Sequence, residues 1–140
     1  MKIIIENDLE YNKLGKSLFG KIYLTSEGFD FPDEEWTDFV FPILEWWANE
    51  LTAKRNTSRQ LQLLFMDGSF EMTGEITRGR LLLQCRNSYS GEVLGTIECG
   101  EDEFRKNVID GLRLCKKKFT QYGDKKSAEK CSGIIMKMGK

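Results

Sequence analysis

The chain has 140 residues, of which 40% are hydrophobic and 31% charged, and its formal net charge is −1. This composition excludes a disordered or proline-rich chain and is typical of a single globular domain, here residues 1–140, of mixed α and β structure. No apolar run reaches the ~18 residues of a membrane-spanning helix, and the absence of histidine excludes imidazole catalysis and histidine metal ligands.

The N-terminal part is expected to form strands. Short strands are predicted at 2–5 and 21–25, where Ile, Leu and Tyr predominate, and residues 12–20 between them predict no element. The residues from Met1 to Asp8 lack the apolar stretch of ~7–15 residues that a secretory signal requires. A cytoplasmic location is therefore expected.

The first helix is predicted over about residues 37–54, because apolar side chains recur there at spacings of three and four. This stripe consists of Trp36, Val40, Ile43, Trp47 and Leu51. Trp47 belongs to the stripe, whereas its neighbour Trp46 points about 100° away. Core packing is the favoured interpretation for Trp46, and the alternative is a partly exposed side chain that could anchor a contact.

Pro42 constrains where this helix begins. In a helix interior, proline would cost about 3 kcal/mol. Either the helix begins at residues 37–39, with Pro42 close to its first turn, or it kinks at Pro42. Asp33, Thr37 or Asp38 would cap the N-terminus.

Residues 61–99 predict an antiparallel strand meander, because apolar and polar residues alternate there with period two. Asp67-Gly68 and Arg78-Gly79 are the expected hairpin turns, and residues 87–91 form a longer loop. One face of the sheet should be covered and the other wetter. The covered face would comprise Phe70, Met72, Ile76, Leu81, Leu83, Cys85, Val93, Ile97 and Cys99.

A second main helix is predicted over about residues 102–122, followed by a short C-terminal helix that Ser127 would cap. Gly123 would end the second main helix. The buried stripe of that helix would comprise Phe104, Val108, Leu112, Cys115, Phe119 and Tyr122. Because strands and helices are grouped rather than alternating, the predicted class is α+β. We expect an antiparallel sheet of about five or six strands, packed on one face by the two main helices.

No residue pattern predicts a catalytic, cofactor or metal site. The cysteines, at positions 85, 99, 115 and 131, contain no Cys-x-x-Cys pair and, without an imidazole to activate them, are interpreted as small buried hydrophobes. Phosphate-binding glycine loops, Gly-x-Ser-x-Gly and calcium loops are absent from the sequence. A non-enzymatic protein without cofactors is therefore predicted, with a carboxylate-based hydrolase as a minor alternative.

The near-neutral total charge hides two opposed regions. Residues 22–53 contain eight acids and no base, whereas residues 105–140 contain eleven bases and three acids. One interpretation is that the acids form a solvated face that the basic C-terminal region neutralises. The other is that they form a docking surface. The lysine clusters do not predict nucleic-acid binding, because no aromatic–basic motif accompanies them and the pI is about 5.6.

The densest part of the acidic region mixes carboxylates with aromatic residues, which resembles an interface core with a charged rim. Its predicted partner-binding residues are Glu27, Asp30, Asp33, Glu34, Glu35, Trp36 and Asp38. Acidic surfaces accelerate association with basic partners. The segment therefore favours a protein-binding domain that docks on a basic protein.

A resemblance accompanies these residues. Phe31-Pro32-Asp33-x-x-Trp36-Thr37-Asp38-Phe39, followed by Trp46-Trp47 and Phe65-Met66-Asp67-Gly68, resembles a group of small uncharacterised bacterial proteins. Some members of that group resemble immunity proteins of polymorphic-toxin systems. The resemblance covers about residues 20–120, its motifs are structural rather than catalytic, and it carries over no functional residue. It implies a cytosolic protein that neutralises a toxin domain by binding it.

A second hypothesis remains open beside the binding function. The chain could be a structural or regulatory module that forms a homodimer by pairing its acidic and basic regions head to tail. Neither hypothesis involves a membrane.

Overall fold

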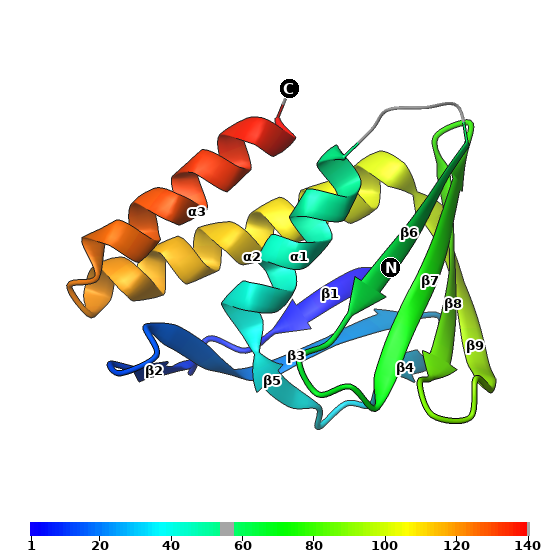
Figure 1. The fold of residues 1–140 in the computed structure, drawn as a ribbon, viewed down its shortest axis with the longest axis horizontal. Coiled ribbons are helices and arrows are strands. Elements are labelled where there is room, and N and C mark those ends of the chain that lie inside the picture. The colour runs from blue at the N-terminus through cyan, green and yellow to red at the C-terminus, as the bar shows by residue number, and fades with distance from the viewer. Residues whose placement is uncertain (54–57, 140) are drawn as a thin grey trace.

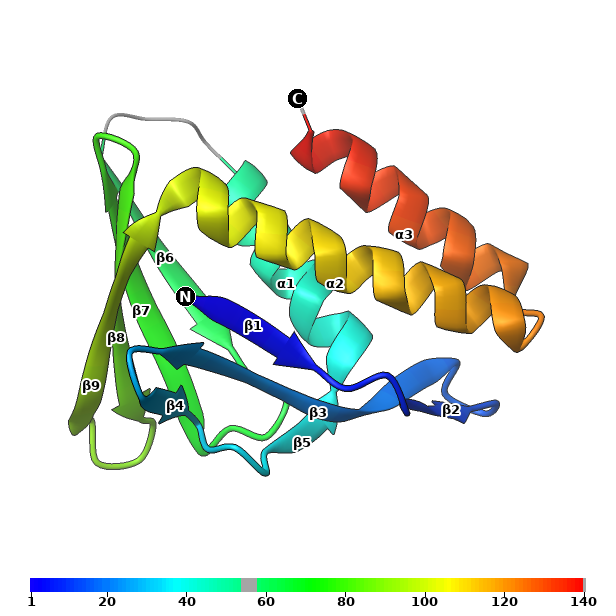
Figure 2. The ribbon, with the colours of Figure 1, turned by 180° about the vertical axis from the view of Figure 1, so that it is seen from behind.

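The computed structural model describes residues 1–53 and 58–139. Two antiparallel sheets, of five and four strands, and three helices make up these residues, which confirms the α+β class. The strands are thus divided between two sheets. Figures 1 and 2 show that the sheets form two sides of a corner, with α1 and α2 inside it and α3 packed outside them.

The first sheet is built around the long strand β3 (Ser17–Ser26). Its neighbours are β1 (Lys2–Ile5), β2 (Glu10–Asn12), β4 (Phe29–Phe31) and β5 (Thr37–Phe39). Strands β1 and β5 pair with opposite edges of β3. Lys21 O accepts from Glu6 N, whereas the next residue, Ile22, donates its N–H to Trp36 O, and the backbone groups of consecutive strand residues point to opposite edges. The predicted strands at 2–5 and 21–25 are therefore confirmed, and the second is longer than expected.

The second sheet is the predicted meander. Its strands β6 (Ser58–Leu64), β7 (Phe70–Thr77), β8 (Arg80–Asn87) and β9 (Val93–Gly100) pair in chain order. The first hairpin loop is longer than two residues. The second is the predicted two-residue turn.

The two turns differ in backbone conformation. Arg78 and Gly79 both have positive φ, 51° and 76°, as a type I′ turn requires. Asp67 instead stabilises the loop after β6 through its side chain: its Oδ1 atom accepts hydrogen bonds from Ser69 N at 3.0 Å and Ser69 Oγ at 2.6 Å. Asp67-Gly68 is therefore a turn within a five-residue loop, residues 65–69.

The predicted covered face is correct except at one end of β9. Met72, Ile76, Leu81, Leu83, Cys85, Ile97 and Cys99 are buried, and Phe70 packs partly buried against the core. Val93 is exposed, because a bulge between Cys85 and Arg86 shifts the register and sets Val93 opposite Arg86 on the outer face. A bulge of one residue reverses the side to which the following residues point.

Helix α1 (Val40–Thr52) begins three residues later than predicted. Pro42 therefore occupies the third helical position, where its missing N–H needs no partner within the helix. Trp36 precedes β5 and is not part of the helix, so its inclusion in the helical stripe was wrong. The capping prediction was also wrong: Phe39 is the N-cap residue, and it makes no side-chain capping bond.

Helices α2 (Glu101–Gln121) and α3 (Lys125–Met138) form an antiparallel hairpin at the C-terminus. Gly123, with φ 77°, lies just beyond α2, as predicted. Tyr122 is half exposed, because it lies past the last helical turn. The N-cap of α3 is Asp124, which accepts a hydrogen bond from Ser127 N at 3.1 Å, so Ser127 donates to the cap and is not the cap itself.

The core lies in the corner between the sheets. Its largest fully buried side chains include Trp47, Phe31, Phe104 and Phe119. All four cysteines are free and buried, which confirms their interpretation as core residues. Within the described residues, none of the helices has the length and apolar character needed to cross a membrane.

Candidate functional site

The acidic segment, residues 27–38, begins at a tight hairpin. Glu27 and Gly28 connect β3 to β4 with positive φ angles of 49° and 81°, which are the angles of a type I′ turn. The turn leaves Glu27 exposed, whereas Asp30 is half-buried in β4 opposite Thr25. The hairpin therefore presents the Glu27 carboxylate to solvent.

The loop between β4 and β5 presents the next three acids. Asp33 organises it: its Oδ1 atom accepts from Glu35 N at 2.8 Å, and its carbonyl oxygen accepts from Trp36 N at 3.2 Å. Asp33, Glu34 and Glu35 are all exposed. Glu35 pairs with Lys21 at 3.0 Å, and Lys21 also contacts Glu6 at 3.1 Å; these two carboxylates raise the pKa of Lys21.

Asp38 does not belong to the exposed surface, which corrects its assignment as a partner-binding residue. It is only 3% exposed. Its carboxylate accepts hydrogen bonds from Phe39 N at 2.7 Å, Asp67 N at 3.3 Å and Trp36 Nε1 at 3.3 Å. Burial raises the pKa of Asp38, although these three donors oppose the increase. Asp38 therefore joins β5 to the loop 65–69.

The aromatic residues of the acidic segment face inward. The Trp36 ring makes edge contacts with Phe70 at 5.2 Å and Phe65 at 6.1 Å between centroids, and Phe31 is buried. Phe29 covers Gly95 of β9, since a Cβ atom at that glycine would lie 2.5 Å from its ring. These contacts attach the acidic segment to the second sheet and leave only part of Trp36 exposed.

The acids of this segment are not neutralised by the basic C-terminal region. Among the described residues, the ion pair between residues 22–53 and residues 105–139 is Glu45–Lys130, at 3.2 Å. Glu27, Asp33 and Glu34 form no ion pair within the described part of the chain. Figure 1 shows the turn between α2 and α3 at the opposite end of the molecule from β4. The exposed acids therefore carry charges that the basic C-terminal region does not compensate.

Two exposed features have no counterpart among the predicted site residues. The first is a set of exposed apolar side chains: Trp46 on α1 is 40% exposed, and Leu64 at the end of β6 and Met66 in the following loop are 36% and 42% exposed. The favoured core interpretation of Trp46 was therefore wrong. The second feature is a groove on the outer face of β6, β7 and β8. The alternating pattern predicted a wetter face there, but nothing in the sequence singled out particular residues on it.

The structure also bears on chemical reactivity. Burial raises the pKa of Cys85 to about 12 and that of Cys99 to about 11, so these thiols are protonated at neutral pH and poor nucleophiles. The described residues hold no cluster of three or more potential metal-ligating side chains of His, Cys, Asp or Glu. No family model, curated protein or solved structure significantly matches the chain.

Proposed function

We propose that the chain is a non-enzymatic binding protein that docks on a basic protein through the exposed acids of residues 27–35. The observation that carries this proposal is that Glu27, Asp33 and Glu34 are exposed and lack an ion-pair partner in the described residues. The resemblance to immunity proteins gives the partner a class, namely a toxin domain that the chain neutralises by covering it.

The rigid attachment of the acidic segment supports this proposal. The segment is fixed by the hairpin at Glu27, by the Asp33 turn and by Trp36 packing on Phe65 and Phe70. Charged side chains on a fixed backbone lose less conformational freedom when they bind. Uncompensated carboxylates also attract a basic partner before contact, which raises the association rate at low salt.

Affinity capture with charge-reversed baits tests the proposal. The test bait carries Glu27→Lys and Glu34→Lys, and the control bait carries Glu92→Lys and Glu129→Lys, two exposed acids outside the segment. A basic protein from the native cell should be retained by the wild-type and control baits and lost from the test bait. With the purified partner, the test variant should associate about tenfold more slowly at low salt.

Partner identity and salt dependence complete the test. If the partner is a toxin domain, co-expression of the wild-type chain should restore growth, and co-expression of the test variant should not. Retention of the partner that is indifferent to both charge reversal and added salt would refute the acidic docking surface.

A further inference from the structure

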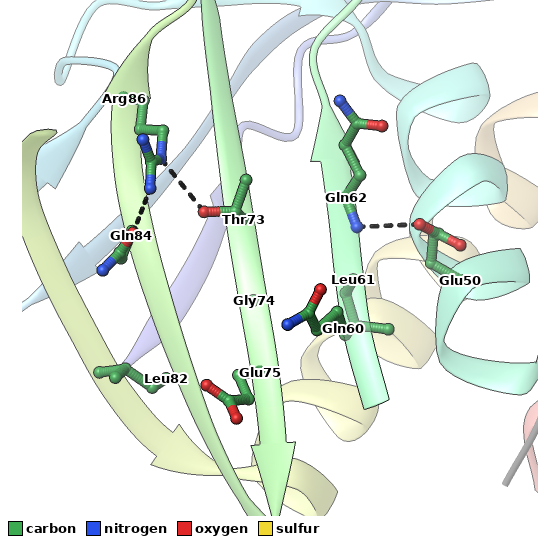
Figure 3. Close-up of a pocket in the computed structure, with 10 residues that line it drawn as sticks. All are labelled: Glu50, Gln60, Leu61, Gln62, Thr73, Gly74, Glu75, Leu82, Gln84 and Arg86. Carbon is green, nitrogen blue, oxygen red and sulfur yellow. Dashed lines mark hydrogen bonds between the residues drawn. The ribbon is translucent and has the colours of Figure 1, made fainter. Parts of the chain in front are cut away.

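The outer face of the four-stranded sheet carries a groove of about 490 Å³. Figure 3 shows the polar side chains that line it on one side of β6, β7 and β8, with Glu50 of α1 beside β6. The strand register arranges these side chains in cross-strand rows. Gln60, Glu75 and Leu82 are neighbours in one row, and Gln62, Thr73 and Gln84 are neighbours in the next.

Hydrogen bonds occupy one end of the groove. Arg86 donates from Nε to Thr73 Oγ1 at 3.2 Å and from Nη2 to the side-chain oxygen of Gln84. Gln62 donates its backbone N–H to Glu50 Oε1 at 2.9 Å and its side-chain amide to Glu71 Oε2 at 3.2 Å. The cation Arg86 and both of these glutamines are therefore already engaged.

The other end of the groove offers acceptors that are not engaged. The side chains of Glu75 and Gln60 make no hydrogen bond or ion pair within residues 1–53 and 58–139. Leu82 lies beside Glu75 in the same row and is 42% exposed. The next cation on this face, Arg80, pairs with Glu98 at 3.4 Å. This end thus combines a free carboxylate, a free amide oxygen and an apolar surface.

An arginine side chain matches this combination. Its planar guanidinium group carries five N–H donors that can bond a carboxylate and an amide oxygen together, and its alkyl stem packs on apolar surface. A lysine ammonium group has fewer donors and no fixed plane. We propose that the end of the groove formed by Glu75, Gln60 and Leu82 binds an arginine side chain of a protein partner.

This inference rests on the proposed function, since it assigns an arginine to the basic partner and adds a second contact surface. The loop 65–69 lies between the two surfaces. Asp67 N bonds to Asp38 of the acidic segment, and β6 leads from the loop back to Gln60 near the other end of that strand. A partner that engages both surfaces must therefore extend about 15 Å along β6 from the loop to Gln60.

An NMR titration of the ¹⁵N-labelled full chain tests the arginine site. The probes are the peptide Arg-Gly-Arg-Gly-Arg and its lysine and citrulline counterparts, of which citrulline keeps the shape of arginine without its charge. We expect the side-chain amide resonances of Gln60 to move most with the arginine peptide, less with the lysine peptide and least with the citrulline peptide.

A matched pair of variants separates a specific site from general attraction. Glu75→Gln should weaken binding of the arginine peptide about fivefold. The control is Glu98→Gln, on the same face and in the same row but paired with Arg80. It should change the affinity for the arginine peptide by less than about twofold. Both positions are exposed, so neither substitution should disturb folding, which the unperturbed resonances of the core will report.

Each other outcome overturns the inference in a recognisable way. Equal losses in the two variants would show only general attraction. Shifts confined to residues 27–35 would refute the groove and leave the proposed docking surface standing. Shifts on neither surface would refute the groove and count against the proposed function as well.

Discussion

Asp38 joins two segments that are far apart in the sequence. It accepts a hydrogen bond from Asp67 N, and its neighbour Trp36 packs on Phe65. Acidic and aromatic residues of the two segments therefore form one structural junction between β5 and the loop 65–69. These residues support the fold.

Replacement of Asp38 should be costly even without a change of size. Asp38→Asn keeps one acceptor oxygen but turns an NH₂ group toward donors, because all three partners of the carboxylate donate. We expect the free energy of unfolding to fall by about 2 kcal/mol, measured by chemical denaturation at neutral pH. A change under about 0.5 kcal/mol, the usual scale of surface substitutions, would contradict the assigned network.

The same pair of proteins should show a defined pH dependence. Burial raises the pKa of Asp38 above its ordinary value of 3.8, so the folded protein binds this proton more tightly than the unfolded chain. The stability of the wild type relative to Asp38→Asn should therefore increase as the pH falls through the folded-state pKa toward 3.8, and decrease as the pH rises. Denaturation at several pH values between about 4 and 7 measures this difference; the opposite slope would show a lowered pKa.

At the residue scale, the sequence predicted exposure well where a residue follows the period of its element. Leu81, Leu83 and Cys85 are buried as their alternation indicates. Asp38 was assigned to the wrong side because its position depends on a contact that is distant in sequence. Trp46 was assigned to the core although its place outside the helical stripe indicated exposure, and it is 40% exposed. The Asp38 carboxylate is buried against the loop 65–69, where Asp67 N donates to it, and no pattern within residues 27–38 predicts that contact.

At the scale of elements, the helices cover the strand edges with single side chains. Asn107 of α2 accepts from Ile3 N at 3.0 Å, and Glu50 of α1 accepts from Gln62 N at 2.9 Å. Trp47 of α1 donates to Leu64 O at 2.9 Å. These bonds occupy backbone groups of β1 and β6 that could otherwise pair with a strand of another molecule.

Close packing of α2 on its neighbours depends on Gly111. A Cβ atom there would lie 2.8 Å from Ile5 Cδ1 and 2.9 Å from Leu44 Cδ1. These contacts with the ends of two side chains should cancel or outweigh the gain in helix propensity, so Gly111→Ala should leave the free energy of unfolding unchanged or lower it by up to about 1 kcal/mol. Gly133→Ala, in α3 with nothing within 4 Å, should raise it by about 0.5–1 kcal/mol through helix propensity.

The two glycine variants control one another, because both add the same methyl group to a helix interior. Thermal and urea denaturation give the two free energies on one scale. Equal stabilisation of both variants would show that α2 can move away from β1 and α1 at little cost, and would refute close packing at Gly111.

The positions of the helices and strands were largely predictable from the sequence, whereas the way they connect and pack together was not. The period of the apolar residues located α2, and the strands at 2–5 and in the meander. Because an interior proline is costly, Pro42 predicted that α1 begins shortly before it, and the helix does begin at Val40. The bulge at Cys85 and Arg86 and the division of the strands into two sheets depend on packing between segments, which a local pattern does not encode.

At the scale of the whole molecule, the charges remain separated after folding. The acids of residues 27–35 lie along β4 and the loop after it, whereas the bases of residues 105–139 lie on α2 and α3. Within the described chain these two sets form no ion pair with each other, and Lys130 of α3 instead pairs with Glu45 of α1. This arrangement is compatible with capture of a basic partner. It also makes the head-to-tail homodimer a testable alternative.

The isolated chain should nevertheless be a monomer of 16.2 kDa at low and high salt. Exposed ion pairs contribute at most about 1 kcal/mol each, and association must first offset several kcal/mol of lost translational and rotational freedom. Sedimentation velocity at about 50 mM and 500 mM NaCl, which spans the range from weak to strong screening, measures the oligomeric state. A dimer at low salt that dissociates at high salt would favour the self-associating module.

The three indole rings of this chain differ in their access to water, and this gives the protein a built-in optical reporter. Trp47 is buried, Trp36 is half-buried beside the acidic loop, and Trp46 is 40% exposed on α1. A soluble fluorescence quencher should therefore reach Trp46 first and Trp47 last. A molecule that settles on the acidic loop would shield Trp36 and shift its emission to the blue, so docking can be followed on the unlabelled protein.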